Sequence, residues 1–162
     1  MSSATEEFLD KLDFPLYIVT AAARGELSGC IVGFVTQCSM DPVRLLVCIS
    51  EKNHTHEVAL GASTVAVHLV PAERSDLVDL FGSHSGYEID KFSRCEWSEG
   101  PGGVPLLEGC PSRLIGTVLG RTPAGDHTAL LVEVTSGEAG PEERLYTFSM
   151  AKAQDVDPGR DP

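Results

Sequence analysis

The chain is 162 residues long, 42% of its residues are hydrophobic, and 24 acidic against 12 basic side chains give a formal net charge of −12. This length and composition indicate one globular domain and exclude the fibrous and disordered classes. A chain this acidic repels phosphate backbones, so nucleic acid is not an expected partner.

Short strands dominate the elements predicted for the first half of the chain. Runs rich in β-branched and aromatic residues predict strands, and glycine and proline mark their ends. The run from Cys30 to Met40 is interpreted as one strand interrupted at Gly33. In chain order, the expected elements are strand Pro15–Ala21, a turn over Arg24–Gly29, strands Cys30–Met40 and Val43–Ser50, and a helix from the N-cap Asn53 to Leu60. Three strands joined by short turns predict an antiparallel meander.

The second half mixes further strands with one clear helix. Leu77, Leu80 and Phe81 share a face of an amphipathic helix predicted over Ala72–Phe81. The other expected elements are strands Thr64–Val70, Ser112–Leu119, His127–Thr135 and Leu145–Phe148. Strands at hairpin spacing predict a mostly β fold, an antiparallel barrel with a few short helices. We expect one domain over residues 1–150 and a loosely packed C-terminal tail over 151–162.

Apolar runs and charge also indicate where the protein resides. The longest apolar runs fall far short of the roughly 20 residues of a membrane span, so no membrane association is expected. Met1–Asp10 is acidic, unlike a secretory signal, and a cytoplasmic location is expected. The five cysteines form no CxxC pair, which favours buried, reduced thiols over a metal or redox site.

The segment Ser50–His56 runs from a strand end into a helix start. Such a place offers unpaired N–H groups and side-chain donors that suit a phosphate. Ordinary helix capping by Asn53 explains the same residues and is the favoured interpretation from the residues alone, because capping residues are common. The two histidines, His54 and His56, are two residues apart and would point in different directions, so a metal site is not expected.

A second polar group lies at Gly125-Asp126-His127, at the start of a predicted strand. A histidine there could bind a ligand or move a proton, because its pKa lies near neutrality. A plain hairpin turn, in which the aspartate caps its own backbone, is the alternative.

Taken in order, several short motifs resemble the flavin reductase-like family over roughly residues 15–148. The order and spacing of the motifs carry this resemblance more than any single one. They are Ser39-Met40-Asp41-Pro42, Lys52–His56, the strand Thr64–Val70, Leu80-Phe81-Gly82, Asp90-Lys91-Phe92, Gly103–Leu107 and Gly125–Thr128.

The resemblance implies an FMN-binding split barrel that forms a homodimer with flavin sites at the subunit interface. It implies that residues along 32–39 follow the isoalloxazine ring and ribityl chain, and that the 50–56 segment holds the phosphate. The implied cofactor-binding residues are Val32, Gly33, Thr36, Gln37, Cys38, Ser39, Ser50, Lys52, Asn53, Thr55 and His56. His127 is the implied catalytic residue, placed to position the nicotinamide.

The implied reaction is hydride transfer from NADH or NADPH to N5 of FMN or FAD, with the reduced flavin passed to a partner monooxygenase. Two departures from the family pattern stand out: Ile31–Val35 replaces a hydroxyl-rich stretch, and Tyr87 stands where a more polar residue is common. The first departure keeps open a non-catalytic flavin carrier or sensor as the alternative. An oxygenase-like or deazaflavin-using barrel is a third reading.

Overall fold

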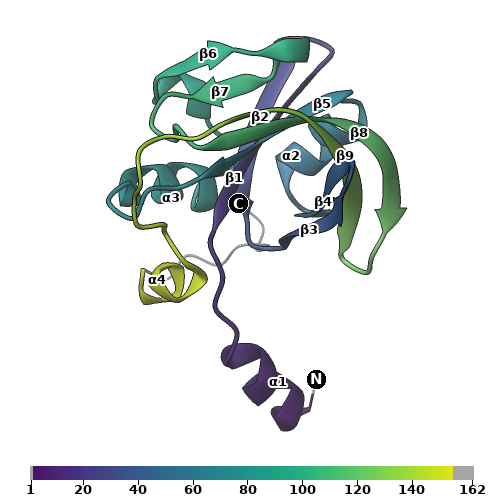
Figure 1. The fold of residues 1–162 in the computed structure, drawn as a ribbon. Coiled ribbons are helices and arrows are strands. Elements are labelled where there is room, and N and C mark those ends of the chain that lie inside the picture. The colour runs from purple at the N-terminus through teal and green to yellow at the C-terminus, as the bar shows by residue number, and fades with distance from the viewer. Residues whose placement is uncertain (1, 155–162) are drawn as a thin grey trace.

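The computed structural model describes residues 2–154, and Figure 1 shows that seven strands curl around a common interior. The sheet order is β2-β1-β5-β8-β9-β4-β3, and every neighbouring pair is antiparallel. Its strands are β1 (Tyr17–Ala23), β2 (Glu26–Val32), β3 (Val35–Met40), β4 (Val43–Ser50), β5 (Thr64–Leu69), β8 (Arg113–Pro123) and β9 (His127–Glu138). A separate two-stranded sheet pairs β6 (Trp97–Glu99) with β7 (Pro105–Leu107).

The curl of the large sheet follows from its connectivity. β2 and β3 are the two edge strands, yet only Gly33 and Phe34 separate them in sequence. Three extended steps, from Val32 to Val35, span at most about 11 Å. The two edges must therefore come close at this corner, and the sheet bends to bring them there.

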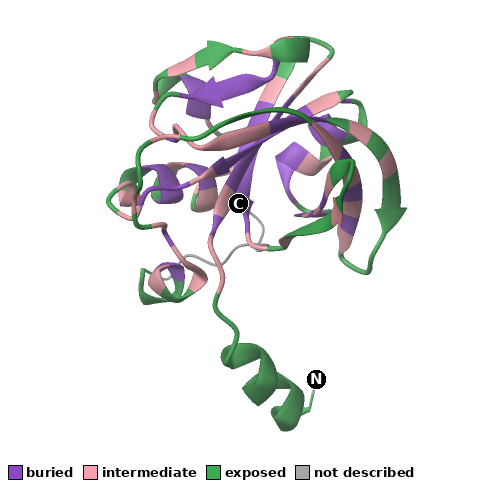
Figure 2. Cartoon of the chain, in the orientation of Figure 1, coloured by how far each residue is buried: buried purple, intermediate pink, exposed green. Residues whose placement is uncertain are grey.

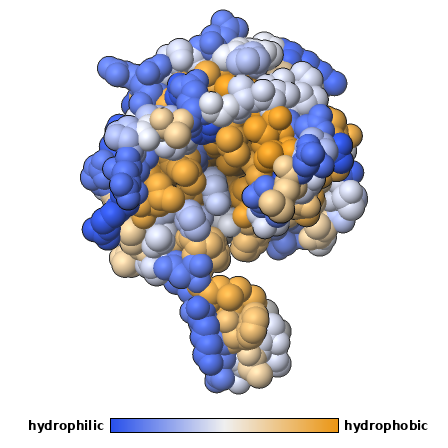
Figure 3. Space-filling view, viewed as in Figure 1, coloured by the Kyte–Doolittle hydropathy of each residue, from blue (hydrophilic) through white to orange (hydrophobic). Residues whose placement is uncertain are grey.

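Short helices close the ends of the curled sheet and cover its outside. The helices are α1 (Ser3–Asp10), α2 (His54–Leu60), α3 (Ser75–Gly82) and α4 (Phe148–Ala153), with single 3-10 turns η1 at Lys91–Ser93 and η2 at Pro101–Gly103. Helix α1 extends away from the body in Figure 1 and has no buried residue. Figure 3 shows an apolar side on this projecting helix, and Phe8 and Leu9 are among its exposed apolar residues. In residues 2–154, no helix has the length and apolar character needed to cross a membrane.

Buried residues are concentrated along the strands of the large sheet (Figure 2), and their side chains form a cluster on each of its faces. Along β1, Val19 points into the interior cluster, whereas its neighbour Ile18 joins the outer cluster beneath α3 and α4. This alternation is the two-residue period of a strand. Helix α2 contributes Val58 and Ala59 to the interior cluster, which ties the helix to the sheet.

The predicted fold class is confirmed: the chain is mostly β, antiparallel, with a few short helices. Asn53 caps α2 as predicted, with its side-chain oxygen accepting from the Thr55 N–H. The helix expected over Ala72–Phe81 is found as Ser75–Gly82, because Pro71–Arg74 forms a turn before it.

Two predicted elements are wrong. The run Cys30–Met40 is two strands at opposite edges of the sheet, so the first three strands do not form a meander. The expected strand Leu145–Phe148 is replaced by two isolated bridges followed by α4, because Thr147 caps a helix there. Short elements such as α1, β6 and β7 were missed.

The boundary between the predicted domain and its tail falls inside α4. Ala151, the first residue of the expected tail, is buried against the outer cluster. The part of the expected tail over residues 155–162 lies outside the described residues. The domain boundary stays a prediction.

Candidate functional site

A narrow pocket, here called the corner pocket, lies where the β2–β3 corner meets the end of β4 and the start of β9. It combines apolar and polar side chains with the backbone of the two-residue corner. Its lining residues are Cys30, Ile31, Val32, Gly33, Phe34, Cys48, Ser50, Asn53 and His127. Five residues predicted from sequence therefore meet here: Val32, Gly33, Ser50, Asn53 and His127.

Strand register brings the two predicted polar segments together. Ser50 at the end of β4 pairs directly with His127 at the start of β9. Beyond this pair, the Glu51 N–H donates to the Asp126 carbonyl over 2.9 Å. The segment that follows β4 and the turn that precedes β9 therefore lie side by side, although about 75 residues separate them along the chain.

His127 is held by its neighbours in the turn and the corner. Its Nδ1 lies 2.7 Å from Oδ1 of Asp126, and its ring centroid is 5.2 Å from that of Phe34. The hydrogen bond with His127, aided by the positive charge of Lys52, lowers the pKa of the Asp126 carboxyl. Asp126 thus occupies Nδ1 of the ring, and Nε2 is the nitrogen that remains for a ligand. The Oδ1 atom of Asp126 therefore orients His127, whereas the hairpin-turn alternative had this side chain capping its own backbone.

The predicted phosphate residues differ in what their side chains contact. Asn53 Oδ1 accepts from the Thr55 N–H over 2.9 Å, and Thr55 Oγ1 is fully buried and lies 2.9 Å from Ser28 Oγ. His56 Nε2 lies 2.7 Å from the hydroxyl of Thr128. Lys52 is exposed. Of this group, Lys52 and Ser50 have the side chains best placed to meet a ligand, whereas the others shape the turn.

The remaining predicted residues lie along β3, away from the corner pocket. Thr36 and Gln37 line an open groove of about 530 Å³ at the mouth of the curled sheet. Cys38 is exposed at the register shift between Gln37 and Ser39. Apolar side chains of six residues, Tyr17, Val35, Leu45, Val67, Leu69 and Leu114, line much of this groove. The predicted cofactor residues thus fall into two groups on one edge of the sheet.

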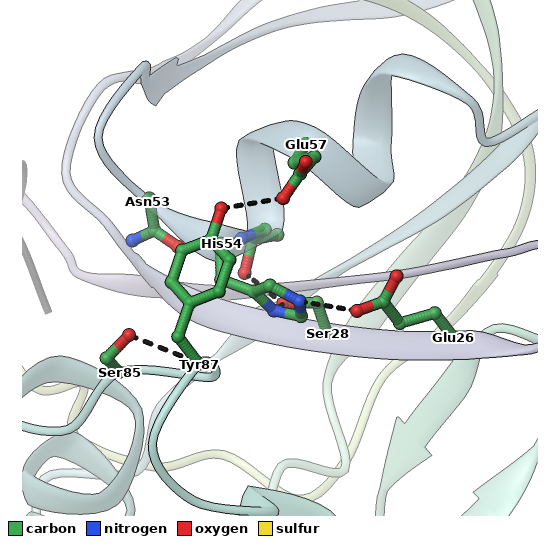
Figure 4. A network of polar contacts seen from close by, with 8 residues as sticks. Glu26, Ser28, Asn53, His54, Glu57, Ser85 and Tyr87 are labelled. Atoms are coloured by element: carbon green, nitrogen blue, oxygen red, sulfur yellow. Dashed lines mark hydrogen bonds and ion pairs between the residues drawn. The ribbon is translucent and has the colours of Figure 1, made fainter.

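A polar network that the sequence did not predict lies on the other side of α2 (Figure 4). His54 Nδ1 is 2.7 Å from Ser28 Oγ, and its Nε2 is 2.7 Å from Oε1 of Glu26. These residues border a second pocket, of about 350 Å³, here called the rear pocket; its lining runs over 26–29, His54 and 86–92. Glu26 and Ser28 are two apart on β2 and share a face, which is the one signal the sequence offered.

Lys91, in the Asp90-Lys91-Phe92 motif, is a buried structural residue. Its ammonium donates to the carbonyls of Gly29 and Phe81 over 3.1 and 3.2 Å. Burial lowers its pKa to about 8. Phe92 packs edge-on against Phe81, so this motif ties η1 to α3 and β2.

The fold and the corner pocket together define a small antiparallel β protein with a narrow cavity of about 10 Å³ at the corner between its two edge strands. The model of the flavin reductase like domain matches residues 9–154, and the chain belongs to this family. The family expected from the order of the motifs is therefore confirmed.

Several characterised proteins are similar over most of the chain. A ferric-chelate reductase (NAD(P)H) of Archaeoglobus fulgidus is 28% identical over 86% of this chain and 83% of its own length. The reductase component of an FADH2-dependent resorcinol hydroxylase from a Rhizobium species is 27% identical over 83% and 76%.

Solved structures show the same fold. An NADH:FAD oxidoreductase of Streptomyces globisporus superimposes with a TM-score of 0.81 at 24% identity, over 89% of this chain and 86% of that one. An FMN-binding protein of Thermus thermophilus gives a TM-score of 0.76 at 28% identity, over 83% and 76%.

Proposed function

We propose that this protein is an NAD(P)H-dependent flavin reductase that reduces FMN or FAD at the corner pocket. The observation that carries the proposal is the convergence of His127, Ser50 and Asn53 on the β2–β3 corner, in a chain of the flavin reductase family. Relatives named for NAD(P)H-dependent reduction and for FMN reduction support the reaction class.

The residues at the corner fit a flavin. A flavin has a flat, mostly apolar ring system and a polar tail, which ends in phosphate in FMN. The corner offers the half-exposed ring of Phe34 and the partly exposed Gly33 at its surface, with buried Val32, Ser50 and Asn53 lining the narrow cavity behind them. When bound, the flavin supplies an acceptor at N5 for the hydride that leaves nicotinamide C4.

His127 has the role of positioning the nicotinamide. Asp126 fixes the imidazole through Nδ1, and Phe34 packs against its ring. The ring is therefore held in one orientation, and Nε2 can bind a polar group of the substrate without a further conformational search. The side chain is only 13% exposed, which keeps water from competing at that position.

The phosphate end of the flavin is assigned to the turn after β4. Lys52 supplies an exposed positive charge in a chain of net charge −12, so attraction for an anion has to be local. Ser50 supplies a hydroxyl, and the cap by Asn53 holds the turn in shape. The predicted contacts of Thr36, Gln37, Cys38 and Ser39 belong to the β3 edge of the same site.

A homodimer, a monooxygenase partner and a cytoplasmic location complete the proposal. Reductase components of a resorcinol hydroxylase and of a Rhodococcus jostii flavin-dependent monooxygenase are among the relatives, which supports a role in supplying reduced flavin. Exposed apolar side chains such as Met40 and Val43, on the strands that flank the groove, support a partner copy there.

Oxidation of NADH and NADPH by the purified protein, with FMN or FAD supplied in turn, tests the proposal. The expected result is loss of nicotinamide absorbance that depends on added flavin, with one flavin and one nicotinamide preferred. A protein that binds flavin but oxidises neither nicotinamide would be a carrier or sensor, and the reductase proposal would be wrong.

A further inference from the structure

The segment over residues 83–90, between α3 and η1, is attached to α2 by Tyr87. The Tyr87 hydroxyl donates to Glu57 Oε2 over 2.6 Å, and its ring meets the His54 ring edge-on with centroids 4.6 Å apart (Figure 4). Gly86 lies so close to His54 that a Cβ there would be 2.5 Å from its Nδ1. The segment is therefore in direct contact with the first turn of α2.

Hydrogen bonds continue from this contact into the turn itself. His54, 5% exposed, binds Ser28 through Nδ1, and Ser28 Oγ in turn lies 2.9 Å from Thr55 Oγ1. The Thr55 N–H donates to Asn53 Oδ1. A connected set of contacts thus runs from Tyr87 to Asn53, and each inner member is buried.

The two ends of this set face different pockets. Tyr87 and His54 border the rear pocket, whereas Asn53 and Ser50 border the corner pocket. The first turn of α2 is the wall between them. A displacement of that turn on the rear side would also move the Asn53 cap and the backbone N–H groups after Lys52 on the front side.

Resting on the proposed function, we propose that Tyr87 is a positioning residue for flavin phosphate. It holds the first turn of α2 through Glu57 and His54, and so keeps the turn that Asn53 caps in the shape that presents Ser50 and Lys52 to the phosphate. Tyr87 does not itself touch the flavin. Turn bonds at Ser85 give the segment its own support, since Tyr87 N donates to Ser85 Oγ and Ile89 N to the Ser85 carbonyl.

The phosphate-specific character of this role gives a clean test. Dissociation constants of FMN and of riboflavin, which lacks the phosphate, are measured by fluorescence titration of the wild type and of Tyr87→Phe. The variant keeps the ring contact and loses the hydrogen bond to Glu57. We expect its Kd for FMN to rise about three- to tenfold, as for one lost hydrogen bond to a carboxylate, with the Kd for riboflavin unchanged.

Further variants separate positioning from general destabilisation. Glu57→Ala should match Tyr87→Phe, and the double variant should be no weaker than either, because both remove one interaction. Tyr146→Phe is the matched control; it removes a hydroxyl that bonds the Met150 carbonyl beside α4 and should leave both constants unchanged. In turnover, KM for FMN should rise in Tyr87→Phe while kcat at saturating FMN stays at the wild-type value.

The FMN and riboflavin dissociation constants decide whether Tyr87 positions the phosphate site. An equal loss for FMN and riboflavin, or no loss for either, would overturn the role of Tyr87 while leaving the wild-type reductase intact. A wild type that binds flavin but does not oxidise NADH or NADPH would overturn the proposed reaction, and the titrations would still decide the role of Tyr87. A wild type that binds neither flavin would overturn both.

Discussion

Ser50 and His127 are directly paired on adjacent strands β4 and β9, and both line the corner pocket. Ser50 belongs to the segment that we assign to the flavin phosphate, and His127 is the residue that we assign to the nicotinamide. Antiparallel register therefore sets the spacing between two functions that lie far apart in sequence, and a change in either residue should have a separable effect.

We expect His127→Ala to lower kcat/KM for NADH about ten- to a hundredfold, while the Kd for flavin changes little. The ring positions the nicotinamide, so its loss removes orientation and not the flavin site. Steady-state kinetics with a separate flavin titration measure both quantities. His84→Ala is the control, because His84 is a half-exposed histidine on the segment after α3 and does not line the corner pocket. Full activity in His127→Ala would contradict the assigned role.

Asp126→Asn should have a smaller effect than His127→Ala, about threefold to tenfold on kcat/KM. The amide keeps an oxygen near Nδ1 of His127 but loses the charge that strengthens this bond. The same assay detects it. An effect as large as that of His127→Ala would show that the carboxylate itself is essential.

Lys52→Ala should weaken FMN binding about three- to tenfold and make it less dependent on ionic strength, with riboflavin binding unaffected. Lys52 is exposed, so its attraction for phosphate is screened by salt. Titrations at low and high salt measure the change. Lys11→Ala, at the end of the projecting α1, is the matched control and should leave both salt dependences as in the wild type.

Gly116→Ala should destabilise the fold by about 2 kcal/mol, whereas Gly120→Ala on the same strand should be close to neutral. A Cβ at Gly116 would lie 2.6 Å from the backbone oxygen of Glu133, which cannot turn aside, whereas nothing lies within 4 Å of one at Gly120. Urea unfolding of both variants measures the difference. Equal stabilities would mean that the β8–β9 ladder can relax around the extra methyl group.

Stability should fall as the pH falls from about 6.5 to about 4 because of His68. Burial lowers the pKa of this histidine from 6.5 to about 4. Its neutral ring is fully used, with Nδ1 bonding the Ile18 carbonyl and Nε2 accepting from the Leu107 N–H. The unfolded chain therefore binds a proton that the native state does not accept until a lower pH.

The sign and size follow from this difference in proton uptake. The contribution of His68 is fully present above pH 6.5 and is lost progressively toward pH 4, by about 3 kcal/mol. Urea unfolding at several pH values measures it. His68→Asn should have a lower stability at neutral pH and a flatter pH profile, whereas His84→Ala should keep the wild-type slope. A wild-type slope in His68→Asn would assign the pH dependence to other groups.

Local signals explain the parts of the fold that were predicted correctly. The cap at Asn53, the strand Val43–Ser50 and the hairpin turn before His127 each depend on residues close together in sequence. The resemblance to the flavin reductase family depends on the order of such local motifs, and it too could be established without coordinates.

Long-range pairing explains what was missed. Nothing local to Cys30–Met40 indicates that its two halves belong to opposite edges of one sheet. The same holds for the network of Glu26, Ser28 and His54, since those residues meet only because β2 packs against α2. Thr55 shows the consequence for function: its hydroxyl was predicted to face a phosphate and lies against Ser28.

The sequence by itself therefore determined the class of fold and the family. It also determined that the polar segments lie at turns and helix starts. Only the tertiary structure decided which side of the first turn of α2 each polar group faces, and that Tyr87 packs against this turn from behind. The physical reason is that hydrogen-bonding capacity is a property of each residue, whereas its direction is set by packing between segments distant in the chain.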